Sequence, residues 1–96
     1  MPLKAAQKKK LRGQAHHLKP FVTVADKGLS ESVVAEIERA LSDHEFIKVK
    51  LRGEREKRKV WEHDIAEQCN AELVHSIGQV ACFYRKNPEK PVIDLG

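Results

Sequence analysis

 Cysteine and aromatic residues are scarce in this 96-residue chain, which holds two cysteines, one tryptophan, one tyrosine and three phenylalanines. Cys69 and Cys82 form no C-x-x-C pair, so we expect neither a disulfide framework nor a zinc module. Both cysteines lie among apolar neighbours, which is typical of buried free thiols in a reducing compartment. Most aromatic residues are expected in the core, which argues against sequence-specific base stacking on a sheet.

Long apolar runs and catalytic signatures are also lacking. The longest apolar run, Val80 to Tyr84, is too short to cross a bilayer, and no apolar segment follows the early lysines as in a signal peptide. His16 and His17 are adjacent and would point about 100° apart on a helix, so they cannot chelate jointly. No nucleophile elbow, phosphate-binding glycine signature or convincing acid pair is present. We therefore expect a cytoplasmic protein without metal, cofactor, membrane contact, small-molecule substrate or enzyme activity.

Charge, by contrast, is abundant and unevenly distributed. Charged residues make up 33% of the chain, the formal net charge is +4 and the pI is about 9.2. Residues 1–29 carry seven bases and one acid, and residues 46–60 carry seven bases and two acids, whereas 30–45 and 61–77 are acidic. A fold that gathers the positive segments on one face would favour a polyanionic partner. The alternative is a set of ordinary solvated faces.

The length predicts one domain over residues 1–96, and the apolar periodicity predicts three helices and four strands. Helices are expected at 4–15, from the Ser30 N-cap onward and at 54–70. In the last of these, Trp61, Ile65 and Cys69 form an apolar stripe that is supported by Val60 and Ala66. Strands are expected at 21–24, 46–52, 73–77 and 80–84, with Phe21 in a buried strand and a type II′ turn at Gly78-Gln79.

The order α-β-α-β-α-β-β predicts an α/β fold with a mixed four-stranded sheet packed with three helices. The strand–helix–strand units favour parallel pairing, and the final hairpin must be antiparallel. The tail after Asn87-Pro88 is expected to be irregular.

Two segments stand out as candidate binding elements. The loop Ala25-Asp26-Lys27-Gly28 precedes a capped helix, whose free N–H groups suit phosphate, although a routine connecting loop is the alternative. In the strand at 46–52, the alternation predicts that three cations point away from the apolar face. These are Lys48, Lys50 and Arg52. Protection of an edge strand against aggregation is the alternative interpretation. The first helix adds auxiliary cations, namely Lys8, Lys9, Lys10 and Arg12.

Five stretches together resemble a known family. They are Leu11 to Pro20, Val24 to Ser30, His44 to Lys50, Ile77-Gly78, and Phe83-Tyr84-Arg85. In this order and spacing they resemble the bacterial YhbY-like proteins, which consist of one CRM domain, named for chloroplast RNA splicing and ribosome maturation. The resemblance covers about residues 5–86 and leaves 87–96 as a tail.

The resemblance implies a fold similar to the C-terminal domain of bacterial translation initiation factor three. It also implies RNA binding through a GxxG loop and a basic surface, and association with precursors of the large (50S) ribosomal subunit. The loop corresponds to Ala25-Asp26-Lys27-Gly28, so Ala25 stands in place of the first glycine. If that position needs a positive φ, alanine costs about 1 kcal/mol or more.

Two hypotheses follow. In the first, the protein is an assembly factor that binds ribosomal RNA through Lys27, the helix after Ser30 and the cations of the strand at 46–52. In the second, the protein docks on a ribosomal or regulatory protein through the acidic side of its second helix, without touching RNA. That acidic side is formed by Glu31, Glu36 and Glu38.

Overall fold

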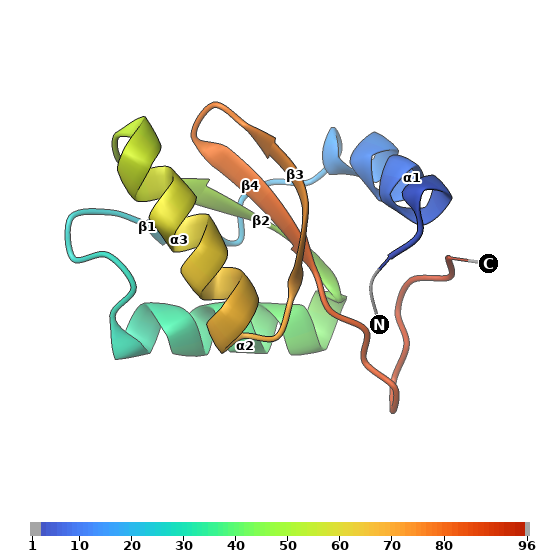
Figure 1. Cartoon of the computed structure of the whole chain (residues 1–96). Coiled ribbons are helices and arrows are strands. Elements are labelled where there is room, and N and C mark those ends of the chain that lie inside the picture. The colour runs from blue at the N-terminus through green and yellow to red at the C-terminus, as the bar shows by residue number, and fades with distance from the viewer. Residues whose placement is uncertain (1–2, 96) are drawn as a thin grey trace.

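The computed structural model describes residues 3–95 and has the predicted order of elements (Figure 1). The elements are α1 (Ala5–Ala15), β1 (Val22–Val24), α2 (Glu31–His44), β2 (Phe46–Leu51), α3 (Arg55–Gln68), β3 (Glu72–Ile77) and β4 (Val80–Tyr84). The predicted α/β class is therefore confirmed.

The sheet is mixed, as predicted, with strand order β1-β2-β4-β3. β1 runs parallel to β2, with Val24 opposite Leu51, and β4 runs antiparallel to both β2 and β3. Gly78 has a φ of 54°, and Gln79 does not lie in the left-handed region. This combination agrees with the type II′ turn that was predicted for the hairpin.

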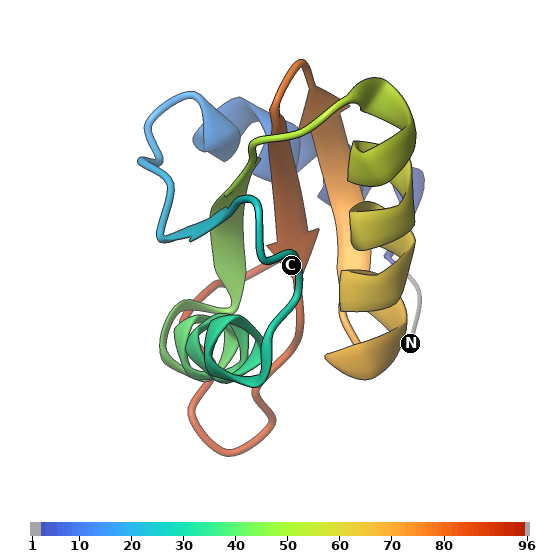
Figure 2. The same ribbon diagram turned by 90° about the vertical axis from the view of Figure 1, so that its left-hand side faces the viewer.

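Helices cover the two faces of the sheet unequally. Figure 2 shows α2 and α3 on the near side of the strands and α1 on the far side. Alternation along β2 sends Ile47, Val49 and Leu51 into the core beneath α2 and α3, where all three are fully buried. On the far face, α1 packs Leu11 and Ala15 in a second cluster. The other buried members of that cluster are Phe46, Val74, Cys82 and Tyr84.

The ends of α2 are fixed by specific hydrogen bonds. Ser30 is the N-cap, as predicted, and its Oγ accepts the Val33 N–H at 3.3 Å. The helix ends at His44, and its C-cap, Glu45, has a φ of 62° and a fully buried side chain. A buried carboxylate needs donors, and Glu45 finds them in the C-terminal tail.

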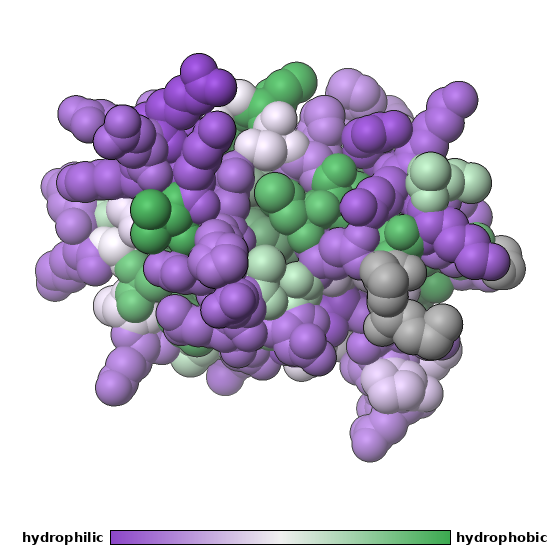
Figure 3. All heavy atoms as spheres, viewed as in Figure 1, coloured by the Kyte–Doolittle hydropathy of each residue, from purple (hydrophilic) through white to green (hydrophobic). Residues whose placement is uncertain are grey.

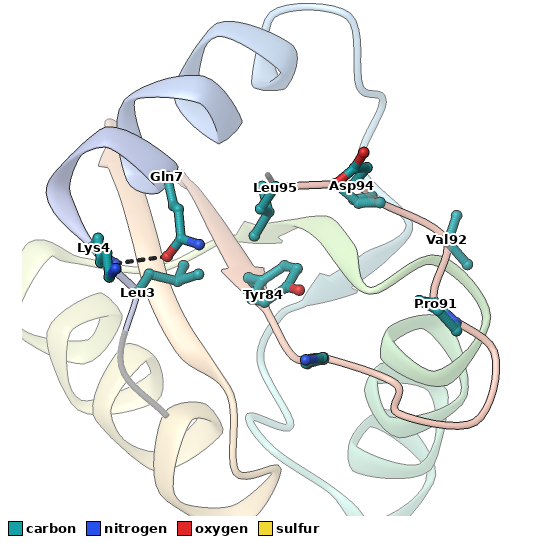
Figure 4. Close-up of a pocket in the computed structure, with 10 residues that line it drawn as sticks. Leu3, Lys4, Gln7, Tyr84, Pro91, Val92, Asp94 and Leu95 are labelled. Carbon is teal, nitrogen blue, oxygen red and sulfur yellow. Dashed lines mark hydrogen bonds between the residues drawn. The ribbon is translucent and has the colours of Figure 1, made fainter.

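Residues 87–95 of the tail form no helix or strand, as predicted, but they are hydrogen-bonded to the core. The Glu45 carboxylate accepts N–H groups from Asn87 and Val92 at 2.6 Å and from Ile93 at 2.7 Å. Burial alone would raise the pKa of Glu45, but these three donors and nearby Lys86 bring it below its usual value. Residues of the tail also line a pocket of about 640 Å³ beside Tyr84 and the start of α1 (Figure 4).

Two predicted core positions are wrong. Phe21 precedes β1 and is 41% exposed, because alternation places it with Thr23 on the side away from the core. Its ring instead stacks on His44, with centroids 4.4 Å apart. Val60 is 57% exposed and does not support the apolar stripe of α3, whereas Ile65 and Cys69 of that stripe are buried.

Candidate functional site

The loop between β1 and α2 is a tight turn. The Gly28 N–H donates to the Ala25 carbonyl at 2.8 Å, and the Ser30 N–H donates to the Gly28 carbonyl at 3.1 Å. Gly28 has a φ of 63°, which suits glycine, whereas Ala25 does not lie in the left-handed region. Alanine at the first loop position therefore carries no backbone penalty of the kind that a positive φ would impose.

Trp61 of α3 holds this loop in place. A Cβ added to Gly28 would lie 3.4 Å from the indole Nε1, and one added to Gly53 would lie 2.8 Å from Cζ3. The indole therefore lies against both the loop after β1 and the loop after β2. Trp61 was expected only in the apolar stripe of α3. The contact of Trp61 with both loops could have been predicted from the parallel pairing of the two strands. Parallel strands end at the same sheet edge, so Gly28 and Gly53 follow neighbouring strand ends.

A shallow groove separates the loop from α3. It has a volume of about 440 Å³, and Asp26, Lys27 and Gly28 line one wall. The other wall is formed by Glu56, Lys57, Val60 and Trp61. Val60 is exposed because its apolar side chain faces this groove and not the core. We refer to it below as the loop groove.

Cations surround the loop groove. Arg52 comes directly after β2, and its N–H donates to the Val24 carbonyl at 2.8 Å, which places it beside the loop. Lys27, Arg52 and Lys57 are exposed, and none of the three forms an ion pair within residues 3–95. Three further cations follow in α3, namely Arg55, Arg58 and Lys59. Figure 3 shows strongly hydrophilic side chains gathered over the N-terminal end of α3, at the upper left of the view.

The strand cations do not all join this site. Lys48 and Lys50 are half-buried and pair with Cys82 and Val80 of β4, on the face of the sheet that α1 partly covers. Arg52 lies beyond the end of β2, not within it as predicted. The predicted strand is therefore one residue too long, and the main chain of Arg52 adjoins the loop.

The cations of α1 lie away from the loop. Figure 1 shows α1 and the loop after β1 at opposite sides of the molecule. Lys8 pairs with Glu72 of β3 at 3.1 Å, and the Lys10 ammonium donates to the Asp94 carbonyl at 2.7 Å. Lys9 and Arg12 are exposed. Two of the four auxiliary cations thus hold α1 to β3 and to the tail.

The acidic side of α2 is also partly engaged. Arg85 follows β4 and donates through Nη1 to Glu38 at 2.8 Å and to the Cys69 carbonyl at 2.8 Å, so it joins the end of β4 to the middle of α2 and to the C-terminal end of α3. Glu31 and Glu36 stay exposed. Burial, together with Glu38, raises the pKa of the Cys69 thiol to about 11. Both cysteines are buried and free, as predicted.

In residues 3–95, no three His, Cys, Asp or Glu side chains gather where they could hold a metal ion. Over the same residues, no helix is long and apolar enough to cross a membrane.

Comparison with known proteins gives consistent matches. The family model of the CRS1 / YhbY (CRM) domain matches residues 3–85. A probable RNA-binding protein of Pseudomonas aeruginosa is 50% identical over 93% of this chain and 86% of its own length. An RNA-binding protein of Haemophilus influenzae is 42% identical over 94% of this chain and 92% of its own. The solution structure of a hypothetical protein from Staphylococcus aureus superposes with a TM-score of 0.83 at 29% identity, covering 99% of this chain and 100% of that one.

Proposed function

Because the chain belongs to the CRS1 / YhbY (CRM) domain family, we propose that it binds RNA at the sheet edge where β1 and β2 end. The observation that carries this proposal is that Lys27 and Lys57 line the loop groove and Arg52 lies beside the loop, all three exposed and without an ion pair within residues 3–95. Exposed cations that form no ion pair attract phosphate and release counterions when RNA binds. The names of two relatives, both called RNA-binding proteins, support the same partner.

The mode of binding follows from the side chains available. Trp61 lies against two glycines, so its ring supports the loop and is poorly placed to stack on a base. The loop offers a lysine and a tight turn, which suit contacts with the RNA backbone more than with base edges. We therefore infer recognition by charge and shape, without a chemical step.

The proposed contact residues fall into a main set and a peripheral set. The main set is Ala25, Asp26, Lys27, Gly28 and Arg52, with Lys57 added from the structure. The peripheral set is Lys48 and Lys50 on the other sheet face, and the auxiliary cations of α1. RNA that reached the peripheral set would have to pass around the edge of the sheet. Peripheral contacts should accordingly contribute less to affinity than the main set.

The finer proposal is that the RNA is ribosomal and that the protein assists assembly of the large subunit in the cytoplasm. The resemblance of the stretches around His16, Lys27 and Lys48 to YhbY-like proteins supports it. Two buried free thiols agree with a reducing compartment. Co-sedimentation tests the proposal: the protein should travel with large-subunit precursors in a gradient, and moderate salt should remove it. A protein that stays at the top of the gradient at low salt would contradict the ribosomal part.

The alternative, docking on another protein through α2, has less support. Glu38 is held by Arg85, which leaves Glu31 and Glu36 as the exposed acids of the proposed acidic side. Pull-downs after nuclease treatment separate the two hypotheses. We expect ribosomal partners to be lost when RNA is digested, and their retention would favour protein docking.

A further inference from the structure

A second groove lies on the other flank of α3, between this helix and the β3–β4 hairpin. It has a volume of about 360 Å³ and is lined by Arg55, Arg58, Lys59, Glu62, Ser76 and Gly78. Figures 1 and 2 both show the hairpin turn beside the N-terminal half of α3. No residue lines both this groove and the loop groove. We refer to it as the hairpin groove.

The cations that line the hairpin groove destabilise α3 when no anion is bound. Arg55, Arg58 and Lys59 recur at helical spacing, so they share one side of α3 and repel one another. Arg55 and Arg58 also lie in the first turn, where the helix dipole disfavours positive charge. A bound anion would relieve both effects, which makes the groove a candidate anion site.

The contacts within the groove leave its positive charge available. Arg58 donates through Nη1 to the Gly53 carbonyl at 2.7 Å, which orients the guanidinium while its other N–H groups remain. Glu62 is the acid in the lining, and its carboxylate accepts the Ser76 hydroxyl. Arg55 and Lys59 are exposed, and neither forms an ion pair within residues 3–95.

We propose that the hairpin groove binds a phosphate group of the RNA backbone, so that bound RNA crosses α3 from the loop groove. This inference rests on the proposed RNA binding. The two grooves flank one helix, whose diameter with side chains is about 10–12 Å. A polymer with a phosphate at every residue can reach both flanks at once. Three cations against one carboxylate give the groove the charge that such a contact needs.

Removal of the two exposed cations is the first test. The double variant Arg55→Gln/Lys59→Gln is compared with Arg39→Gln/Lys90→Gln, which removes two exposed cations elsewhere. Affinity for a labelled stem-loop RNA is measured across a salt series. We expect the groove variant to lose about tenfold in affinity and about 0.7–0.9 from the slope of log K against log salt, which corresponds to one phosphate contact. The control should lose little of either.

Removal of the opposing acid is the second test and has the opposite sign. Glu62→Gln keeps the shape of the side chain and removes its charge, so RNA binding should tighten by about threefold. Glu36→Gln removes an exposed acid of α2 and should change affinity less. Equal gains in the two variants would indicate a general charge effect and would overturn the groove assignment.

The outcomes separate this inference from the proposed function. If the wild-type protein binds no RNA, the proposed function fails and the inference fails with it. If the wild type binds, and Lys27→Gln weakens binding while Arg55→Gln/Lys59→Gln behaves like its control, only the hairpin groove is excluded. If both variants weaken binding and the control does not, the inference is supported.

Discussion

Trp61 lies so close to Gly53 that a Cβ atom at position 53 would come within 2.8 Å of Cζ3 of the indole. The same indole lies 3.4 Å from where a Cβ of Gly28 would be. One side chain of α3 thus fits against the loops that follow two neighbouring parallel strands. The loop groove exists because these contacts set the distance between the loop and the helix.

Gly53→Ala should therefore destabilise the protein by about 1–3 kcal/mol, because the added methyl group overpacks against the indole. Gly13→Ala is the matched control. Gly13 lies within α1 with no atom near its added Cβ, so alanine there should stabilise by about 0.5–1 kcal/mol. Urea denaturation of both variants measures the difference. Equal effects at the two positions would contradict the contact with Trp61.

Glu45→Gln should lower the free energy of unfolding by about 2–3 kcal/mol at neutral pH, because a charged acceptor of three tail N–H groups is lost. The folded-state pKa of Glu45 lies below its usual value of 4.5. Its contribution is therefore complete above that value and is lost as the pH falls through the lower, folded-state pKa.

The test is the stability difference between the wild type and Glu45→Gln, measured by urea denaturation in steps from neutral to acidic pH. We expect this difference to shrink as the pH falls below 4.5. A difference that stays constant with pH would show that the Glu45 charge does not hold the tail.

The thiol groups should be inert in the folded protein. Burial raises the pKa of Cys69 to about 11 and also raises that of Cys82, so little thiolate is present at pH 8. Alkylation followed by mass spectrometry should show slow labelling of both residues in buffer and rapid labelling in denaturant. Rapid labelling of either residue in the native state would contradict the burial of that thiol.

The sequence predicted the fold well because its signals are local. Alternation along β2 predicted the buried Ile47 and Leu51, the N-cap preference predicted Ser30, and glycine first in the turn predicted the hairpin at Gly78. Phe21 was placed wrongly because a run of strand-forming residues does not show which face receives a covering helix.

Contacts between distant parts of the chain could not be predicted in the same way. The burial of Glu45 depends on tail residues that fold back upon it, and the engagement of Lys8 depends on Glu72 in another element. The candidate site was predicted in part: the loop at 25–28 was singled out, whereas Trp61 and Lys57 joined it only through the position of α3.

The most direct test of RNA binding at the loop compares two double variants that each remove one lysine and one arginine. Lys27→Gln/Arg52→Gln changes the loop groove, and Lys9→Gln/Arg12→Gln changes exposed cations of α1. Affinity for large-subunit ribosomal RNA is measured across a salt series. We predict that the loop variant loses at least about tenfold in affinity and more than one unit of salt slope, while the α1 variant loses much less. Equal losses, or a larger loss in the α1 variant, would contradict the assignment of the loop as the main RNA contact.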